Sequence, residues 1–124
     1  MRFLFTDNVL FLDDSPERCK AFRSAFPSAT IVTTAEECIQ KLQDDVFDVV
    51  CLDHDLGDKV YVQVGTSGHG GDVVRWIVEN KPRIRDVIIH SMNEPASEWM
   101  EATLQDAGYT VLRRSFPLLK ADIS

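Results

Sequence analysis

Two short apolar runs of the chain, at 9–12 and 49–52, contain no charged residue. The residues that follow them are acids and one imidazole: Asp13 and Asp14 after the first run, and Asp53, His54 and Asp55 after the second. A short, continuous apolar run predicts a strand that is buried on both faces of a parallel sheet. If the two strands are neighbours, their carboxylates meet at one edge of the sheet. Carboxylates crowded in this way repel, so either some of them stay protonated or a cation lies among them.

The rest of the chain alternates between strand and helix patterns. Further strands are predicted at 29–33, 47–52, 86–90 and 109–112. Apolar residues at helical spacing lie between them, and three of these helices are preceded by side chains that suit an N-cap: Ser15, Thr34 and Asn93. Val73 to Val78 indicates the remaining helix, and Gly108 ends the last one. This alternation predicts an α/β fold with a parallel sheet and helices on both faces.

Polar side chains concentrate where the predicted strands end. Ligands of open α/β sheets bind beyond the carboxyl ends of the strands. The residues at these ends are Asp13, Asp14, Asp53, Asp55, His90, Ser91 and Asn93. We therefore predict that this edge is functional, with a Mg²⁺ (or Mn²⁺) ion held by the four aspartates. The alternative for these acids is a set of solvated loop residues, with Asp14 placed to favour the dipole of the first helix.

Composition narrows the class of protein. The 124 residues are predicted to form one domain, 1–124, because hydrophobic residues make up 44% of the chain and charged residues 27%. A net charge of -7 without a Lys/Arg run argues against duplex DNA as a partner. We find neither a signal peptide nor a membrane-spanning stretch, which predicts a cytoplasmic protein. The three cysteines lack CxxC spacing and are expected to be buried thiols.

At this point the residues resemble a response-regulator receiver domain over roughly 8 to 117. Asp13-Asp14 resembles the acidic pair of that family, Asp53 its phosphoacceptor and Ser91 its hydroxyl residue. The resemblance implies a flavodoxin-like (CheY-like) three-layer sandwich with a five-stranded parallel sheet in the order 2-1-3-4-5. It also implies that the acids bind Mg²⁺ and that Asp53 accepts a phosphoryl group.

The chain departs from ordinary receivers in several places. The lysine expected after the fifth strand is missing, and Arg113 and Arg114 stand there instead. Only seven residues follow Pro117, so the fifth helix is expected to be absent or very short. The loop after Asp53 is long. These departures resemble the cyclic-phosphate-processing receiver (cREC) branch, whose recurring motifs Leu-Asp-His-Asp-Leu-Gly and His-Ser-x-Asn stand here at 52–57 and 90–93.

The histidines suit the chemistry that this branch implies. Opening a cyclic phosphodiester needs a base for water and an acid for the leaving alkoxide, and imidazole serves both near neutral pH. We predict Asp53, His54, His90 and Ser91 as catalytic residues. The competing interpretation of each single histidine is a structural one. His54-Asp55 also matches the dipeptide of HD phosphohydrolases, but the helical context and further ligands of that class are absent.

Three residues are predicted to contact substrate: His69, Asn93 and Arg114. His69 stands in the glycine-rich stretch 65–71, whose backbone N–H groups suit a phosphate. Residues 59–64 alternate like a hairpin arm, and we interpret 59–71 as a lid, with a plain connector as the alternative. Asn93 is more simply a helix cap. Of Arg113 and Arg114, one can clamp phosphate while the other points away, and a plain surface position is the alternative for either.

The leading functional prediction is a metal-dependent phosphoesterase acting on a cyclic nucleotide or on an RNA 2′,3′-cyclic phosphate end. The alternatives are a phospho-accepting receiver in phosphorelay signalling, with Asp53 as phosphorylation site, and a degenerate receiver that only binds. Partners are expected to be a small phosphorylated ligand or an RNA end, with no membrane involved. A homodimer or partner protein is predicted at the open flank of the fifth strand.

Overall fold

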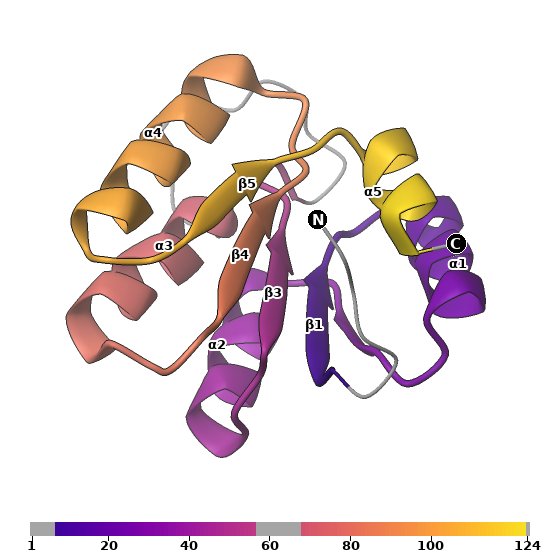
Figure 1. Cartoon of the computed structure of the whole chain (residues 1–124), viewed down its shortest axis with the longest axis horizontal. Helices are drawn as coiled ribbons and strands as arrows, with labels where there is room; N and C mark the ends of the chain where they lie inside the picture. The colour runs from indigo at the N-terminus through magenta and orange to yellow at the C-terminus, as the bar shows by residue number, and fades with distance from the viewer. Residues whose placement is uncertain (1–6, 57–67, 124) are drawn as a thin grey trace.

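The computed structural model of the chain describes residues 7–56 and 68–123, which form a parallel five-stranded sheet in the order β2-β1-β3-β4-β5. This is the order that the resemblance implied, and it is confirmed. The elements in chain order are β1 Val9–Leu12, α1 Pro16–Ala25, β2 Thr30–Val32, α2 Ala35–Asp44, β3 Val49–Leu52, α3 Gly70–Asn80, β4 Asp86–Ile89, α4 Glu94–Asp106, β5 Val111–Arg113 and α5 Phe116–Ile123. Figure 1 shows α1 and α5 together at one side of the sheet and α2, α3 and α4 at the other.

The predicted N-caps form as expected. The Ser15 hydroxyl accepts a hydrogen bond from the Arg18 N–H at 3.2 Å, and the Thr34 hydroxyl accepts one from Glu37 at 3.1 Å. The Asn93 amide oxygen accepts the N–H of Ala96 at 3.2 Å. Each cap satisfies a backbone donor that the first turn of a helix leaves without a partner. These three residues therefore fix where α1, α2 and α4 begin, and so where the preceding strand ends deliver their side chains.

Alternation along the strands divides the core into two layers, because successive strand side chains point to opposite faces. Under α1 and α5 lie Val9, Phe11, Val49, Cys51 and Ile88. Under α2, α3 and α4 lie Leu10, Leu12, Val50, Leu52, Val87 and Ile89. The register aligns Leu12 with Leu52 and Leu52 with Ile89, so equivalent residues of neighbouring strands share a face. The three cysteines are free and buried, as predicted.

The fifth helix is present but short. It comprises eight residues, Phe116–Ile123, packs against α1 and buries Leu119 completely. None of the described helices is long and apolar enough to cross a membrane. The predicted hairpin arm at 59–64 lies outside the described residues. The predicted glycine-rich loop ends earlier than expected, because Gly70 and Gly71 already belong to α3.

Candidate functional site at the carboxyl edge of the sheet

Three of the predicted residues converge at the carboxyl ends of β1, β3 and β4. Asp13, Asp53 and His90 each bring one ligand atom into a group in which all of these atoms lie within 4.8 Å of one another. Within the described part of the chain, this is the single such group of acidic, imidazole or thiol side chains. Asp13 and Asp53 follow Phe11 and Cys51 by two positions, and His90 follows Ile88 by two. The strand alternation therefore places all three on the α1 side of the sheet.

Asp13 is completely buried and fully engaged. Its Oδ2 lies 2.7 Å from Nε of Arg18 and 3.2 Å from Nε2 of His90, and its Oδ1 accepts from Arg18 Nη2 at 3.0 Å and from the Ser15 N–H at 2.9 Å. Burial raises the pKa of Asp13, but the hydrogen bonds from His90 and Arg18 outweigh it and lower the pKa to about 2. The carboxylate is thus ionised at any physiological pH.

The pKa of Asp53 is shifted in the opposite direction from that of Asp13. Oδ1 of Asp53 accepts the backbone N–H of His54 at 2.8 Å, while Oδ2 lies 3.8 Å from Nη2 of Arg18. Burial raises the pKa of Asp53 to about 6, and the nearby charge of Asp13 adds to the rise, against the lowering effects of His90 and Arg18. Two carboxylates of one site therefore have pKa values held far apart, an arrangement that suits Asp53 to accept and release a proton near neutral pH.

The His90 imidazole sits in an aromatic enclosure. Its ring stacks on Phe11 at a centroid distance of 4.8 Å, and Phe116 of α5 meets it edge-on at 6.5 Å. Nε2 faces Asp13, whereas the buried Nδ1 has no hydrogen-bond partner within the described residues. Nε2 of His54 is a second buried nitrogen without a partner among the described residues, so this feature does not distinguish His90. The atom of His90 that lies at the acid group is Nε2.

His54 and Asp55 lie on the other face of the sheet. His54 is fully buried beneath α3, and its Nδ1 contacts Oδ1 of Asp55 at 2.6 Å. Asp55 also accepts the Asn93 side-chain amide at 3.1 Å. Asn93 therefore caps α4 and ties the β3–α3 connection to the β4–α4 connection. The Asn93–Asp55 contact joins the two sequence motifs of the cREC resemblance. His54 and Asp55 therefore lie apart from the group around Asp53.

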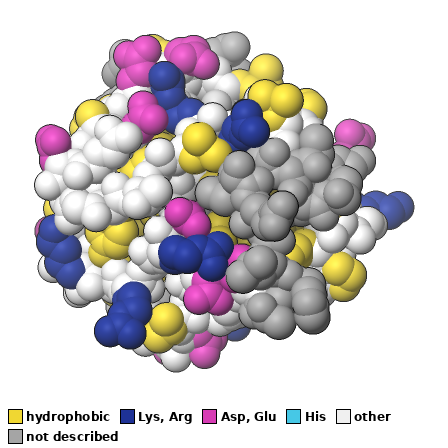
Figure 2. Space-filling model, in the orientation of Figure 1, with side chains coloured by type: hydrophobic (Ala, Val, Ile, Leu, Met, Phe, Trp, Pro, Cys, Tyr) yellow, Lys and Arg dark blue, Asp and Glu magenta, His cyan; other side chains and the backbone are white. Residues whose placement is uncertain are grey.

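The His69 side chain is buried and accepts a backbone hydrogen bond, so it is not exposed to a ligand. It is buried, its Nδ1 accepts the N–H of Leu56 at 2.9 Å, and its ring stacks near that of His54 at 5.8 Å. No histidine is visible on the described part of the face in Figure 2, in keeping with 0%, 4% and 3% exposure of His54, His69 and His90. The predicted lid itself falls largely on 57–67, outside the described residues.

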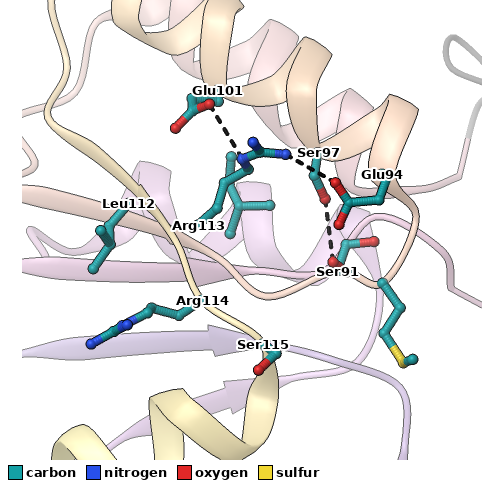
Figure 3. A pocket seen from close by; sticks show the side chains of 10 residues that line it. Ser91, Glu94, Ser97, Glu101, Leu112, Arg113, Arg114 and Ser115 are labelled. Atoms are coloured by element: carbon teal, nitrogen blue, oxygen red, sulfur yellow. Dashed lines mark hydrogen bonds and ion pairs between the residues drawn. The ribbon is translucent and has the colours of Figure 1, made fainter.

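Ser91 and the two arginines border a separate pocket between α4 and β5, with a volume of about 610 Å³. The Ser91 hydroxyl accepts the N–H of Asn93 at 3.1 Å. Arg113 makes ion pairs with Glu94 and Glu101 at 3.3 Å each. Figure 3 shows Arg114 pointing the opposite way, away from α4, as alternation predicted. The register pairs Ile89 with Arg113, so Arg114 falls beside His90 on the α1 side.

The register also decides which residue stands next to Asp53. Leu52 aligns with Ile89, so the next residues of the two strands, Asp53 and His90, lie side by side. The His90 N–H donates to the Leu52 carbonyl at 3.0 Å. The resemblance had given Ser91 the place of the family's hydroxyl residue. In the structure an imidazole, not a hydroxyl, is the immediate neighbour of Asp53. Ser91 lies one position further, toward α4.

Arg18 is the site residue that the sequence interpretation missed. It comes from the first turn of α1 and contacts both Asp13 and Asp53. A signal was available, because Arg18 stands four positions before the buried Phe22 and so shares its helix face. That face covers the layer from which the acids emerge. Asp14, by contrast, is partly exposed and lies outside the three-residue group.

Acidic residues also occur at the opposite edge, so their concentration at the carboxyl edge is less complete than the sequence suggested. There Arg85 holds Asp7 through two contacts of 3.0 Å and Asp86 through one of 2.7 Å. Asp48 accepts the N–H of Asn8 at 2.7 Å. What distinguishes the carboxyl edge is the convergence of ligand atoms from three strands.

The donor set around Asp13 fits a divalent cation. Two carboxylates and one imidazole are ligands that Mn²⁺ and related ions accept, and Mg²⁺ is satisfied by one or two carboxylates and water. The cationic Arg18 among the acids indicates a site that holds positive charge.

The doubly wound sheet and the acids at its carboxyl edge define a receiver-type domain. Solved structures of this class share the fold. The signal receiver domain described as part of a LuxO repressor protein from Vibrio parahaemolyticus has a TM-score of 0.66 and 22% identity, covering 99% of this chain and 88% of that one. The Francisella response regulator 1452 receiver domain gives 0.66 and 17%, covering 95% and 93%. The Mn²⁺-bound response regulator Rcp1 gives 0.57 and 12%, covering 93% and 90%.

More specifically, residues 8–106 match the family described as the cyclic-phosphate processing Receiver domain. The chain belongs to this family. The search of curated proteins gave no match.

Proposed function

We propose that this domain is a divalent-metal-dependent phosphoesterase that opens a cyclic phosphate. The observation that carries the proposal is the convergence of Asp13, Asp53 and His90 within 4.8 Å at the carboxyl edge of the sheet. The family description, which names cyclic-phosphate processing, supports the choice of substrate class. The substrate class covers cyclic nucleotides and RNA ends that carry a 2′,3′-cyclic phosphate.

Asp13, Asp53 and His90 are the residues that would hold the ion. When bound, a divalent cation supplies positive charge to the phosphoryl oxygens and to the attacking water. Asp13 suits a permanent ligand, because its pKa of about 2 keeps it ionised. Without a metal, burial raises the pKa of Asp53 to about 6, so binding of a divalent ion would favour the ionised carboxylate of Asp53.

A single carboxyl group that acts first as base and then as acid is enough to balance the protons of ring opening. Water adds its oxygen to phosphorus and gives one proton to Asp53, the ring P–O bond breaks, and the leaving alkoxide takes that proton. The net reaction adds one water and regenerates the carboxylate. Arg18, whose side chain is 40% exposed, lies 3.8 Å from Oδ2 of Asp53, where a phosphoryl group would approach.

A direct test is turnover of a substrate panel. The purified protein is incubated with Mg²⁺ or Mn²⁺ and 2′,3′-cyclic nucleotides, 3′,5′-cyclic nucleotides and cyclic dinucleotides, and products are followed by phosphorus NMR. We expect multiple turnovers on at least one class, and a loss of about 100-fold or more in Asp53→Asn and His90→Gln. Asp45→Asn, on an exposed acid beyond α2, is the matched control and should keep full activity. No turnover on any of the three classes would contradict the proposal.

A second candidate, a phospho-accepting receiver, is supported by the geometry of Asp53. One carboxylate oxygen is fixed by the His54 N–H while the other faces Arg18 and the acid group. The test is incubation with a small phosphodonor and Mg²⁺, followed by intact mass measurement. Stoichiometric labelling of Asp53 without hydrolysis of the cyclic substrates would favour the switch. Neither labelling nor hydrolysis would leave a binding module.

A further inference from the structure

The guanidinium of Arg18 supplies positive charge to the acid group, as a bound metal ion would. The guanidinium binds both oxygens of Asp13, at 2.7 Å and 3.0 Å, and approaches Asp53 at 3.8 Å. Asp13 is completely buried and Asp53 is 6% exposed. Burying two carboxylates without a nearby positive charge is strongly unfavourable. Arg18 supplies that charge from the side chains of the domain itself.

The same contacts place Arg18 in competition with a metal ion. Both oxygens of Asp13 are used by Arg18, and Oδ2 is shared with His90. A divalent ion that takes Asp13 as a ligand needs at least one of these oxygens. Each oxygen of Asp13 already has two donors, Oδ1 those of Arg18 and Ser15 and Oδ2 those of Arg18 and His90, so a coordinating ion has to displace one of them. Arg18 is the donor among these that solvent reaches through a flexible side chain.

Arg18 can leave without rearranging the fold. It lies in the first turn of α1, and 40% of its side chain is exposed to solvent. Its backbone position is fixed independently by the Ser15 cap and by the buried neighbours Cys19 and Phe22. Rotation about the side-chain bonds thus moves the guanidinium outward while helix and strand stay in place.

We propose that Arg18 is a resident counter-cation that a divalent ion displaces from Asp13, and that the released guanidinium then binds the phosphoryl group of the ligand. This inference rests on the metal binding of the proposed function but not on catalysis. The exchange keeps the buried charge balanced in both states. It also couples phosphate binding to metal binding, because release from Asp13 frees the Nε–H and Nη2–H pair of Arg18 for a bidentate contact with phosphoryl oxygens.

The first test measures Mn²⁺ affinity by calorimetry in the wild type, Arg18→Gln and Arg23→Gln. Arg23 is exposed on the same helix, so its variant removes the same charge without touching the site. We expect Arg18→Gln to bind Mn²⁺ roughly five- to tenfold more tightly than the wild type, and Arg23→Gln less than about twofold. A structural role for Arg18 predicts the opposite sign, because a disordered site binds metal more weakly. Unchanged or weaker binding in Arg18→Gln would overturn the proposal.

The second test measures inorganic phosphate binding at saturating Mn²⁺. Arg18→Gln should weaken phosphate binding about tenfold although it binds the metal more tightly, since one charge-assisted contact is lost. Arg18→Lys keeps the charge and serves as the second variant if Arg18→Gln does not fold. Its phosphate affinity should lie between those of the wild type and Arg18→Gln. Side-chain NMR of the wild type adds a direct measure, because the Nε–H signal of Arg18 should shift on Mg²⁺ addition. Phosphate affinity equal to that of the wild type in both variants, or an unmoved signal, would refute the exchange.

These readouts separate the inference from the proposed function. Metal and phosphate affinities are measured without any turnover, so the exchange can hold in a protein that hydrolyses no cyclic phosphate. Conversely, turnover with unchanged metal affinity in Arg18→Gln would retain the phosphoesterase and refute the role of Arg18.

Discussion

Oδ2 of Asp13 and Nε2 of His90 lie 3.2 Å apart although 77 positions separate them in the chain. The contact spans the sheet from the end of β1, past Asp53 on β3, to the end of β4. It depends on the strand order 2-1-3-4-5, which puts β3 between these two strands. The imidazole brings a nitrogen ligand into an otherwise acidic group and places it where a metal bound to Asp13 would lie within reach.

Replacing His90 should change which metal the site prefers. Imidazole favours Mn²⁺ and later transition metals over Mg²⁺, whereas oxygen ligands suit Mg²⁺. In His90→Ser the group becomes an all-oxygen site, so the ratio of Mn²⁺ to Mg²⁺ affinity should fall about tenfold. Competition calorimetry measures this ratio, with Ser91→Ala as the neighbouring control. An unchanged ratio would contradict the predicted preference, and unchanged affinity for both metals would show that His90 is not a ligand.

Asp53 should make the metal-free protein less stable as the pH rises. Its folded pKa of about 6 exceeds the usual 3.8, so the folded state holds this proton more tightly. The resulting stabilisation is fully present below about pH 4 and is lost as the pH rises through about 6, by on the order of 3 kcal/mol. Asp53→Asn removes it. The free energy of unfolding of this variant minus that of the wild type should therefore grow by that amount between about pH 4 and pH 7.5.

The control for this measurement is within the same pair of proteins. Asp13, with its pKa lowered to about 2, stabilises the fold above about pH 4 and loses that effect as the pH falls through 2. This contribution is common to both proteins and largely cancels in the difference. Urea unfolding at several pH values, with chelator present, gives the curve. A difference that does not vary with pH would mean that Asp53 is not perturbed.

Gly70 should tolerate no side chain, whereas its neighbour should. A Cβ on Gly70 would overlap the carbonyl oxygen of Asp53 and lie 2.9 Å from Cα of His54. A Cβ on Gly71 would meet only side-chain atoms, at 3.4 Å or more. We expect Gly70→Ala to lower the free energy of unfolding by about 3 kcal/mol or more, and Gly71→Ala to change it by less than about 1 kcal/mol. Equal effects in thermal unfolding would contradict the close approach of α3 to β3.

Asn93 should contribute through two separable contacts. Asn93→Ala loses the cap of α4 and the bond to Asp55, and should cost about 2 kcal/mol in urea unfolding. Asn93→Ser keeps a capping oxygen but not the amide, so it should cost about 1 kcal/mol. Asn80→Ala, at the exposed end of α3, is the control and should change stability by less than about 0.5 kcal/mol. If the serine variant matches the wild type, the Asp55 contact contributes nothing.

Much of the fold could be predicted because its determinants are local. The buried strands appear as uncharged runs, and Ser15, Thr34 and Asn93 mark helix starts by their own hydrogen bonds. The strand order came from the resemblance, since local pattern does not reveal which strands are neighbours. The short α5 was harder to foresee, because its stability comes from burying Leu119 against the layer under α1 rather than from its length.

The candidate site was predicted less completely, for a geometric reason. Asp53 and His54 are consecutive, and consecutive residues at a strand end point to opposite faces. Strict use of that rule separates them, and it also separates His90 from Ser91. Grouping by proximity in the sequence obscured this. Arg18 was missed although helical spacing puts it on the face of Phe22, because that spacing alone does not reveal that this face of α1 lies over the acids.

His69 closes a small ring at the base of the long β3–α3 connection. Its contact with Leu56 and the 2.8 Å bond from the Gly70 N–H to the His54 carbonyl link the residues just before position 57 to the residues just after position 67. Because these bonds form without residues 57–67, inserting or exchanging residues in that segment should carry only a modest entropic cost. The bonds at His54, Leu56, His69 and Gly70 can therefore persist when residues 57–67 change in sequence or number.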